Sequence, residues 1–188
     1  MLQQILQLLI TTFFDIYTLI VILRFLLQWA KADFYNPISQ LIVKATDPLV
    51  KPLRRVVPGL WGVDVASLLL ALLVQILGAL LLTALAGQLL VNPFAHLLLA
   101  LFNVFEIVLQ FYFFAIIILV VISWVAPGTP NPAAHLLHQV TEPIIRPVRN
   151  LLPDMGGIDF SPMIVMFVIY ILRSIVLPGV LATLGGML

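Results

Sequence analysis

Charged side chains within apolar stretches are the residues of this chain that could most directly do chemistry. Asp15, Glu106 and Arg173 each lie inside a long apolar run, and ionised groups at membrane depth are costly unless they are paired or functional. Counted along a helix of about 1.5 Å rise per residue, Asp15 and Arg173 lie at the same depth. We therefore expect an Asp15–Arg173 ion pair that joins the two halves of the chain, with Glu106 as the second choice of partner. The same three residues could instead line an ion or proton pathway.

Basic residues between prolines form a second set of candidates. Two Pro-rich segments, residues 31–63 and 126–157, carry most of the lysines and arginines. Such cations bind anionic headgroups, each contributing about 1 kcal/mol near a charged surface, or bind a protein partner, or only set the orientation of the chain. Arg24, near the end of its apolar run, can reach the same surface with its long side chain. The candidate partner- or lipid-binding residues are Lys51, Arg54, Arg55, Arg146 and Arg149.

Three residues of the second segment could hold a metal ion. His135, His138 and Glu142 would share one face of a helix, and imidazole and carboxylate groups are common metal ligands. The internal repeat described below does not share them, so we predict no metal site.

Other kinds of reactive site find no support in the sequence. The chain has no cysteine, which excludes disulfides, thiolate nucleophiles and Fe–S ligation. It also has no Gly-rich phosphate loop, no nucleophile–base constellation and no nucleic-acid patch. We therefore predict no catalytic residues, no cofactor, no nucleic-acid partner and no enzymatic activity.

The composition indicates that lipid surrounds much of this chain. Of the 188 residues, 63% are hydrophobic and 9% are charged, against about 45–50% and about 25% in soluble domains. No basic residue precedes the first apolar run, so we interpret it as a span rather than a cleaved signal peptide. We expect an all-α integral membrane protein with four transmembrane helices, since four runs are long enough to cross a bilayer: residues 5–29, 65–91, 97–125 and 158–182.

An internal repeat relates the two halves. A shift of 95 positions aligns the Pro-rich segments without a gap, so that Asn36-Pro37 meets Asn131-Pro132. Shared membrane composition would rarely place prolines in register, so we infer a tandem duplication with units 1–93 and 94–188. The aligned pairs also include Pro48 with Pro143, Pro52 with Pro147, Arg54 with Arg149, Pro58 with Pro153, Gly62 with Gly157 and Asp64 with Asp159.

The repeat and the cations together predict a topology. Each unit has two spans, so both units face the same way as parallel repeats. The positive-inside rule places both Pro-rich segments in the cytoplasm and both termini outside. We expect the segments to lie in the membrane interface as short helices. Pro48 and Pro52 should prevent one continuous helix, with Thr46 or Asp47 capping a helix that starts at Pro48.

Small and polar residues recur every fourth position along the second span. Such a face lets helices approach closely, and Gln75 can form a hydrogen bond across the contact. Packing within the chain and formation of a homodimer both fit this pattern. The helix-packing residues are Ser67, Ala71, Gln75, Ala79, Thr83 and Gly87.

Several motifs resemble the signature of the YggT family of small bacterial membrane proteins. They are RFLLQW at 24–29, FYNP at 34–37, TDPLVKPLRR at 46–55 and GVD at 62–64. The resemblance implies a multi-pass protein of the bacterial cytoplasmic (inner) membrane. It also associates such proteins with cell-division gene clusters, with cytochrome assembly in plastids and with tolerance of osmotic or ionic stress. The second unit departs from the motif, with Leu119 for Arg24, Gly128 for Asp33 and Asn150 for Arg55.

Two hypotheses for function follow. The first is a non-enzymatic scaffold or assembly factor that presents a repeated basic cytoplasmic surface to a partner protein or an anionic lipid. The alternative is a small transporter or channel component in ion or osmotic homeostasis, with Asp15, Glu106 and Arg173 on the path. The expected partners are membrane lipids, a cytoplasmic or membrane protein, and a second copy of the chain.

Overall fold

The structure is a computed structural model that describes residues 1–57, 59, 62–87, 92–125, 131–153 and 159–185. Over these ranges the ordered elements are all helical. Four helices are long and apolar enough to cross a membrane: α1 (Leu2–Trp29), α3 (Val65–Leu85), α4 (Pro93–Val125) and a last span, Ser161–Thr183. The expected all-α class with four transmembrane helices is confirmed.

The last span is not one regular helix. It consists of α6 (Ser161–Ile171), a π-helical turn η1 (Leu172–Val176) and α7 (Leu177–Gly185). Arg173 lies in the π-helical turn, and such turns are rare and often occur at functional sites.

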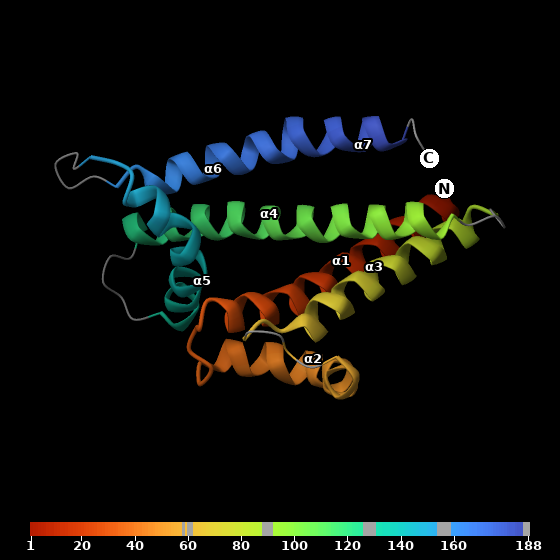
Figure 1. The fold of residues 1–188 in the computed structure, drawn as a ribbon, viewed down its shortest axis with the longest axis horizontal. Helices are drawn as coiled ribbons and strands as arrows, with labels where there is room; N and C mark the ends of the chain where they lie inside the picture. The colour runs from red at the N-terminus through yellow and green to blue at the C-terminus, as the bar shows by residue number, and fades with distance from the viewer. Residues whose placement is uncertain (58, 60–61, 88–91, 126–130, 154–158, 186–188) are drawn as a thin grey trace.

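Both units face the same way in the structure. α1 and α4 run in one direction, α3 and the last span run in the other, and the two termini lie at the same end of the molecule (Figure 1). We call the opposite end, where α1 and α4 end and α3 and α6 begin, the linker end. The parallel arrangement of the repeats is therefore confirmed.

The Pro-rich segments form two long helices at the linker end, α2 (Pro37–Val56) and α5 (Pro132–Arg149). α2 packs against α1 and α3, α5 packs against α4 and α6, and the two touch each other. The contact joins the units directly, since the Asn36 side chain donates a hydrogen bond to the Pro132 carbonyl at 2.9 Å.

The expectation that Pro48 and Pro52 would prevent one continuous helix in the first segment is wrong. α2 continues through Pro48 and Pro52, and α5 continues through Pro143 and Pro147. The prolines bend α2 instead, so that its last turns are seen almost end-on in Figure 1, and proline is the usual cause of such a bend.

The predicted cap at Thr46 or Asp47 is wrong for the same reason. α2 begins earlier, at Pro37, where the Asn36 side chain accepts a hydrogen bond from the backbone N–H of Ile38. Asn131 caps α5 in the same way. Asparagine before a proline at the first helical position is a strong start signal, and it leaves Thr46 and Asp47 inside the helix.

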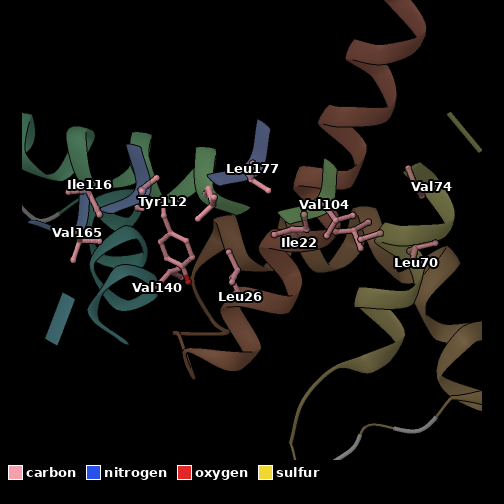
Figure 2. Packing of buried hydrophobic residues seen from close by; sticks show 14 of the residues in the cluster. Ile22, Leu26, Leu70, Val74, Val104, Tyr112, Ile116, Val140, Val165 and Leu177 are labelled. Carbon is pink, nitrogen blue, oxygen red and sulfur yellow. The ribbon is translucent and has the colours of Figure 1, made fainter. Parts of the chain in front are cut away.

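A single apolar cluster joins the helices of both units. Ile22 of α1, Val104 and Ile116 of α4, Val140 of α5 and Val165 of α6 are all buried in it (Figure 2). Because α4 contributes to the cluster along much of its length and packs against α1, α3, α5 and α6, it holds the two units together.

The face of small residues on α3 packs largely within the chain. Ser67, Ala71 and Gln75 are buried, whereas Thr83 is half-buried and Gly87 is exposed. The half of this face nearest the linker end is therefore not available to a second copy of the chain.

Gly78 of α3, a residue that the four-residue pattern omits, lies directly against Phe14 of α1. A Cβ at Gly78 would lie 2.9 Å from Cγ of Phe14, closer than two carbon atoms can come without a shift of the ring. Glycine at this position therefore lets α3 lie against Phe14.

We predict that Gly78→Ala lowers the thermal stability of the detergent-solubilised protein. Overpacking costs about 1–3 kcal/mol, more than the about 0.5–1 kcal/mol that alanine contributes over glycine in a helix. Gly179→Ala is the matched control, since a Cβ there has no neighbour within 4 Å. Thermal unfolding should show a lower midpoint for Gly78→Ala only. Equal midpoints would contradict the close packing.

Candidate functional site

An ion pair fastens α2 to the start of α3. Arg54 donates two hydrogen bonds to Asp64, from Nε to Oδ1 at 3.2 Å and from Nη2 to Oδ2 at 2.6 Å. Asp64 caps α3, accepting from the backbone N–H and the hydroxyl of Ser67. This two-pronged geometry is the strong form of an arginine–carboxylate contact.

The second unit repeats this ion pair. Arg149 at the end of α5 donates from Nε to Asp159 Oδ2 at 2.8 Å, and Asp159 accepts hydrogen bonds from the backbone N–H and hydroxyl of Ser161 at the start of α6. We call α2 and α5 the linker helices. Each is tied to the span that follows it by the same aligned pair of residues.

The first unit adds a buried arginine that the second lacks. Arg24 of α1 donates from Nη1 to Asp47 Oδ1 and to Thr46 Oγ1, both at 2.8 Å, and its Nε lies 3.7 Å from Oδ2 of Asp64. The expectation that Arg24 extends to the membrane surface is wrong, because its side chain is 7% exposed and these two carboxylates hold it inside.

In the second unit Leu119 replaces Arg24, and the pairing adjusts. Glu142, the counterpart of Asp47, accepts from Arg149 Nη1 at 2.8 Å, so one arginine serves both acids. Burial also differs, since the side chain of Asp64 is 2% exposed and that of Asp159 is 41% exposed. The first unit therefore holds the more deeply buried charge cluster.

The pKa values of the two acids in the first unit, Asp47 and Asp64, both lie below their usual value. Burial by itself would raise the pKa of Asp64, but hydrogen bonds from Arg54 and Ser67 outweigh it and hold the pKa below its usual value. The hydrogen bond from Lys51 lowers the pKa of Asp47, burial opposes this, and the hydrogen bond and charge of Arg24 lower the pKa further. Each carboxylate is thus a fixed negative charge facing a cation.

The five cations predicted to form a binding surface differ in how far they are used in ion pairs within the chain and how far they are left exposed. Arg54 and Arg149 are used within the chain. Lys51 pairs with Asp47 at 2.7 Å but is 69% exposed, and Arg55 and Arg146 are exposed and make no ion pair among the described residues. Binding of a partner or lipid by these cations stays a prediction.

Within the bundle the predicted Asp15–Arg173 ion pair is wrong. Arg173 Nη2 lies 3.5 Å from Glu106 Oε1, which was the second choice of partner. Asp15 instead accepts a hydrogen bond from Gln75 Nε2 at 3.0 Å. The depth estimate placed Asp15 and Arg173 level with each other, but it carried no information about which helices are neighbours.

A polar cavity of about 240 Å³ lies where α1, α3 and α4 meet. Asp15 and Glu106 both line it, while Gln75 is fixed between α1 and α4 by its bonds to Asp15, Thr18 and Asn103. The cavity lies between the two units, because α4 belongs to the second. Its polar lining consists of Thr11, Asp15, Gln75, Asn103, Glu106 and Gln110.

His135, His138 and Glu142, which the sequence offers as metal ligands, do not form a metal-binding group in the structure. The Glu142 carboxylate is paired with Arg149, and among the described residues no three histidine, aspartate or glutamate side chains are grouped closely enough to hold a metal ion. Pro58, Gly128 and Gly157, which the sequence analysis also names, lie outside the described residues.

Comparison with known proteins establishes the family. The family model described as CCB3/YggT matches residues 3–85 and again residues 98–180. The chain belongs to the CCB3/YggT family. The second match begins 95 positions after the first, at 98 against 3, which is the same offset as the internal repeat.

Relatives of the YggT family cover nearly the whole chain. The protein YggT of Escherichia coli K12 is 39% identical over 180 residues, 96% of this chain and 93% of its own. A Pseudomonas aeruginosa protein is 44% identical over 172 residues, 91% of this chain and 87% of its own. Both are described as uncharacterized proteins. No solved structure matches the chain.

Sequence reasoning missed the roles of Arg24, Asp47 and Asp64. The signal was present for Asp64, because the repeat aligns both Arg54 with Arg149 and Asp64 with Asp159 at the same separation. An acid and a base that are duplicated together suggest a pair. For Arg24 the repeat gave no such signal, since its counterpart is Leu119.

We predict that Asp64→Asn destabilises the protein more than Asp159→Asn. Removing one partner of a buried pair costs about 3–5 kcal/mol, because the other charge stays buried, whereas an exposed pair is worth about 0–1 kcal/mol. Chemical unfolding in detergent measures both variants. Similar losses of unfolding free energy would show that the difference in burial has no energetic consequence.

Proposed function

We propose that this protein is a non-enzymatic membrane scaffold or assembly factor whose linker end presents a basic, Pro-rich surface to a partner protein or an anionic lipid. The observation that carries the proposal is the rigid fixing of both linker helices. Arg54–Asp64 and Arg149–Asp159 tie each helix to the following span. A flexible linker would lose more conformational entropy when bound than a preformed surface does.

The orientation is part of this proposal. The exposed cations of both linker helices lie at the linker end, whereas the other end of the described chain bears no lysine or arginine. The positive-inside rule supports a cytoplasmic linker end with both termini outside, and the similarity to bacterial YggT proteins supports the bacterial inner membrane as the location. A surface on this side would meet cytoplasmic proteins and the inner leaflet.

Single cysteines test both statements, because the chain has none of its own. Tyr35→Cys and His135→Cys place a thiol at exposed positions of the linker end, and Leu2→Cys is the control at the other end. An impermeant maleimide should label the first two from the cytoplasmic face and the third from the outer face. A maleimide photo-crosslinker should capture a specific protein at the linker end only.

Two results would contradict the proposal. Labelling of Tyr35→Cys and His135→Cys from opposite faces would overturn the parallel topology in the membrane. Capture at Leu2→Cys that equals capture at the linker end would show that the basic surface has no special part in binding.

The polar cavity favours a second candidate function, a small transporter or channel component involved in ion or osmotic homeostasis. Polar side chains at membrane depth are left unsatisfied in hydrocarbon, so a cavity lined by Asp15, Glu106 and Gln110 suits water or an ion. Arg173, which pairs with Glu106, adds a charge that a pathway could use.

Ion flux decides between the two functions. The scaffold hypothesis predicts that proteoliposomes containing the purified protein leak potassium ions and protons no faster than empty liposomes. Asp15→Asn should then leave the flux unchanged. A flux above the empty-liposome level that falls at least about tenfold with Asp15→Asn, but not with the peripheral control Arg146→Gln, would establish the transporter instead.

A further inference from the structure

The exposed side of α2 carries a basic groove, in which Lys51–Asp47 is the one ion pair between described lining residues. Lys44, Lys51 and Arg55 line it together with Phe34 and the two helix prolines, around a volume of about 700 Å³. The three cations stand at helical positions that share one face.

The groove has a net positive charge. Asp47 is the one acid among its described lining residues, and Asp47 is held from behind by the buried Arg24 as well as by Lys51. Arg24 and Lys51 share this acid, so the groove keeps a net positive charge, and Lys44 and Arg55 make no ion pair among the described residues. An anion would find two or three cations within one concave surface.

The flanks of the groove place it at the depth of lipid headgroups. Next to the cations, Leu41, Leu49 and Val56 form an exposed apolar stripe along α2. An amphipathic helix with an apolar stripe beside cations lies in the membrane interface. Trp29 and Tyr35 are also exposed near the start of α2, and tryptophan and tyrosine are enriched at that level.

The corresponding face of α5 keeps only one of the three groove cations. Gln139 and Asn150 stand where α2 has Lys44 and Arg55, and Arg146 is the only cation retained. Gln139 is also used within the chain, because its Oε1 accepts a hydrogen bond from the backbone N–H of Asp33 at 2.9 Å. The duplication therefore preserved the ion pair that fixes each linker helix but not the basic groove.

We propose that the α2 groove binds the phosphate headgroup of an anionic phospholipid from the leaflet at the linker end, with the acyl chains along Leu41, Leu49 and Val56. This inference rests on the proposed function and names the ligand of its basic surface. A lipid fits better than a protein partner because one molecule satisfies both the cations and the adjacent apolar stripe.

The test uses the purified full-length chain in neutral detergent. Binding of phosphatidylglycerol, phosphatidylcholine and inorganic phosphate is measured by native mass spectrometry and by titration. The variant K44Q/K51Q/R55Q removes the groove cations and leaves Arg54 and Arg24 in place, while R146Q removes the exposed cation of α5. Thermal unfolding confirms that both variants are folded.

The wild type should prefer phosphatidylglycerol over phosphatidylcholine by about tenfold or more. Each cation removed should weaken phosphatidylglycerol binding by about fivefold, so the triple variant should lose the preference. R146Q should keep it. Equal binding of both lipids, or a triple variant with unchanged preference, overturns the inference, as does inorganic phosphate binding as tightly as the lipid.

The outcomes also separate this inference from the proposed function. If the triple variant loses its crosslinked protein partner but not its lipid preference, the groove binds protein, and only the lipid assignment fails. If lipid preference and partner capture are both absent from the wild type, the proposed function fails with it.

Discussion

The paired arginine and aspartate that join each linker helix to the next span are the interaction on which this structure depends. A helix that lies across a membrane interface has no backbone hydrogen bonds to the spans that it connects, so its angle and depth must be set by side chains. Arg54 with Asp64, and Arg149 with Asp159, do this at the point where the chain turns back into the bundle. Each aspartate also accepts hydrogen bonds from a serine in the first turn of the following span, Ser67 or Ser161, so one carboxylate contacts both the span and the helix before it.

The same arginine–aspartate pair lies in different surroundings in the two units. In the first, Arg24 enters from α1 and shares Asp47 and Asp64 with Lys51 and Arg54, so three helices meet at a buried charge cluster. In the second, Leu119 removes that cation, and Arg149 alone bridges two partly exposed acids. The first linker helix can therefore leave further cations free for a ligand without leaving a buried acid unbalanced. This difference in burial is what makes the two halves of the YggT fold chemically unequal.

Polarity inside the bundle follows a similar logic. Gln75 bonds to Asp15 and Thr18 on one side and accepts from Asn103 on the other, and Glu106 faces Arg173. Amides and ion pairs together satisfy much of the polar lining where α1, α3 and α4 meet, which is the condition for such groups to persist in an apolar surrounding. The remaining space is a cavity rather than a packed seam, and this keeps a transport role open beside that of a scaffold.

The sequence by itself determined the class, the duplication and the number of spans. These depend on composition, on runs of apolar residues and on prolines in register, all of which are properties of the chain taken in order. The repeat also aligns Arg54 with Arg149 and Asp64 with Asp159, although their pairing was not predicted. The boundaries of units 1–93 and 94–188 stay a prediction, although the two family matches fall within them.

Only the tertiary structure decided which charges meet. The equal depth of Asp15 and Arg173 along their helices predicted that they pair. In the structure Arg173 lies next to Glu106, and Asp15 lies next to Gln75. Depth along a helix does not determine which helices are neighbours in the bundle. From its position near the end of α1, Arg24 was expected to extend to the membrane surface. In the structure α2 covers it, and Thr46 and Asp47 of α2 accept its hydrogen bonds. The prolines inside α2 and α5 do not end these helices. Both helices start at asparagine caps and pack on the spans, and α2 accommodates its prolines by bending (Figure 1). In each case a local rule was overridden by contacts between segments far apart in the chain.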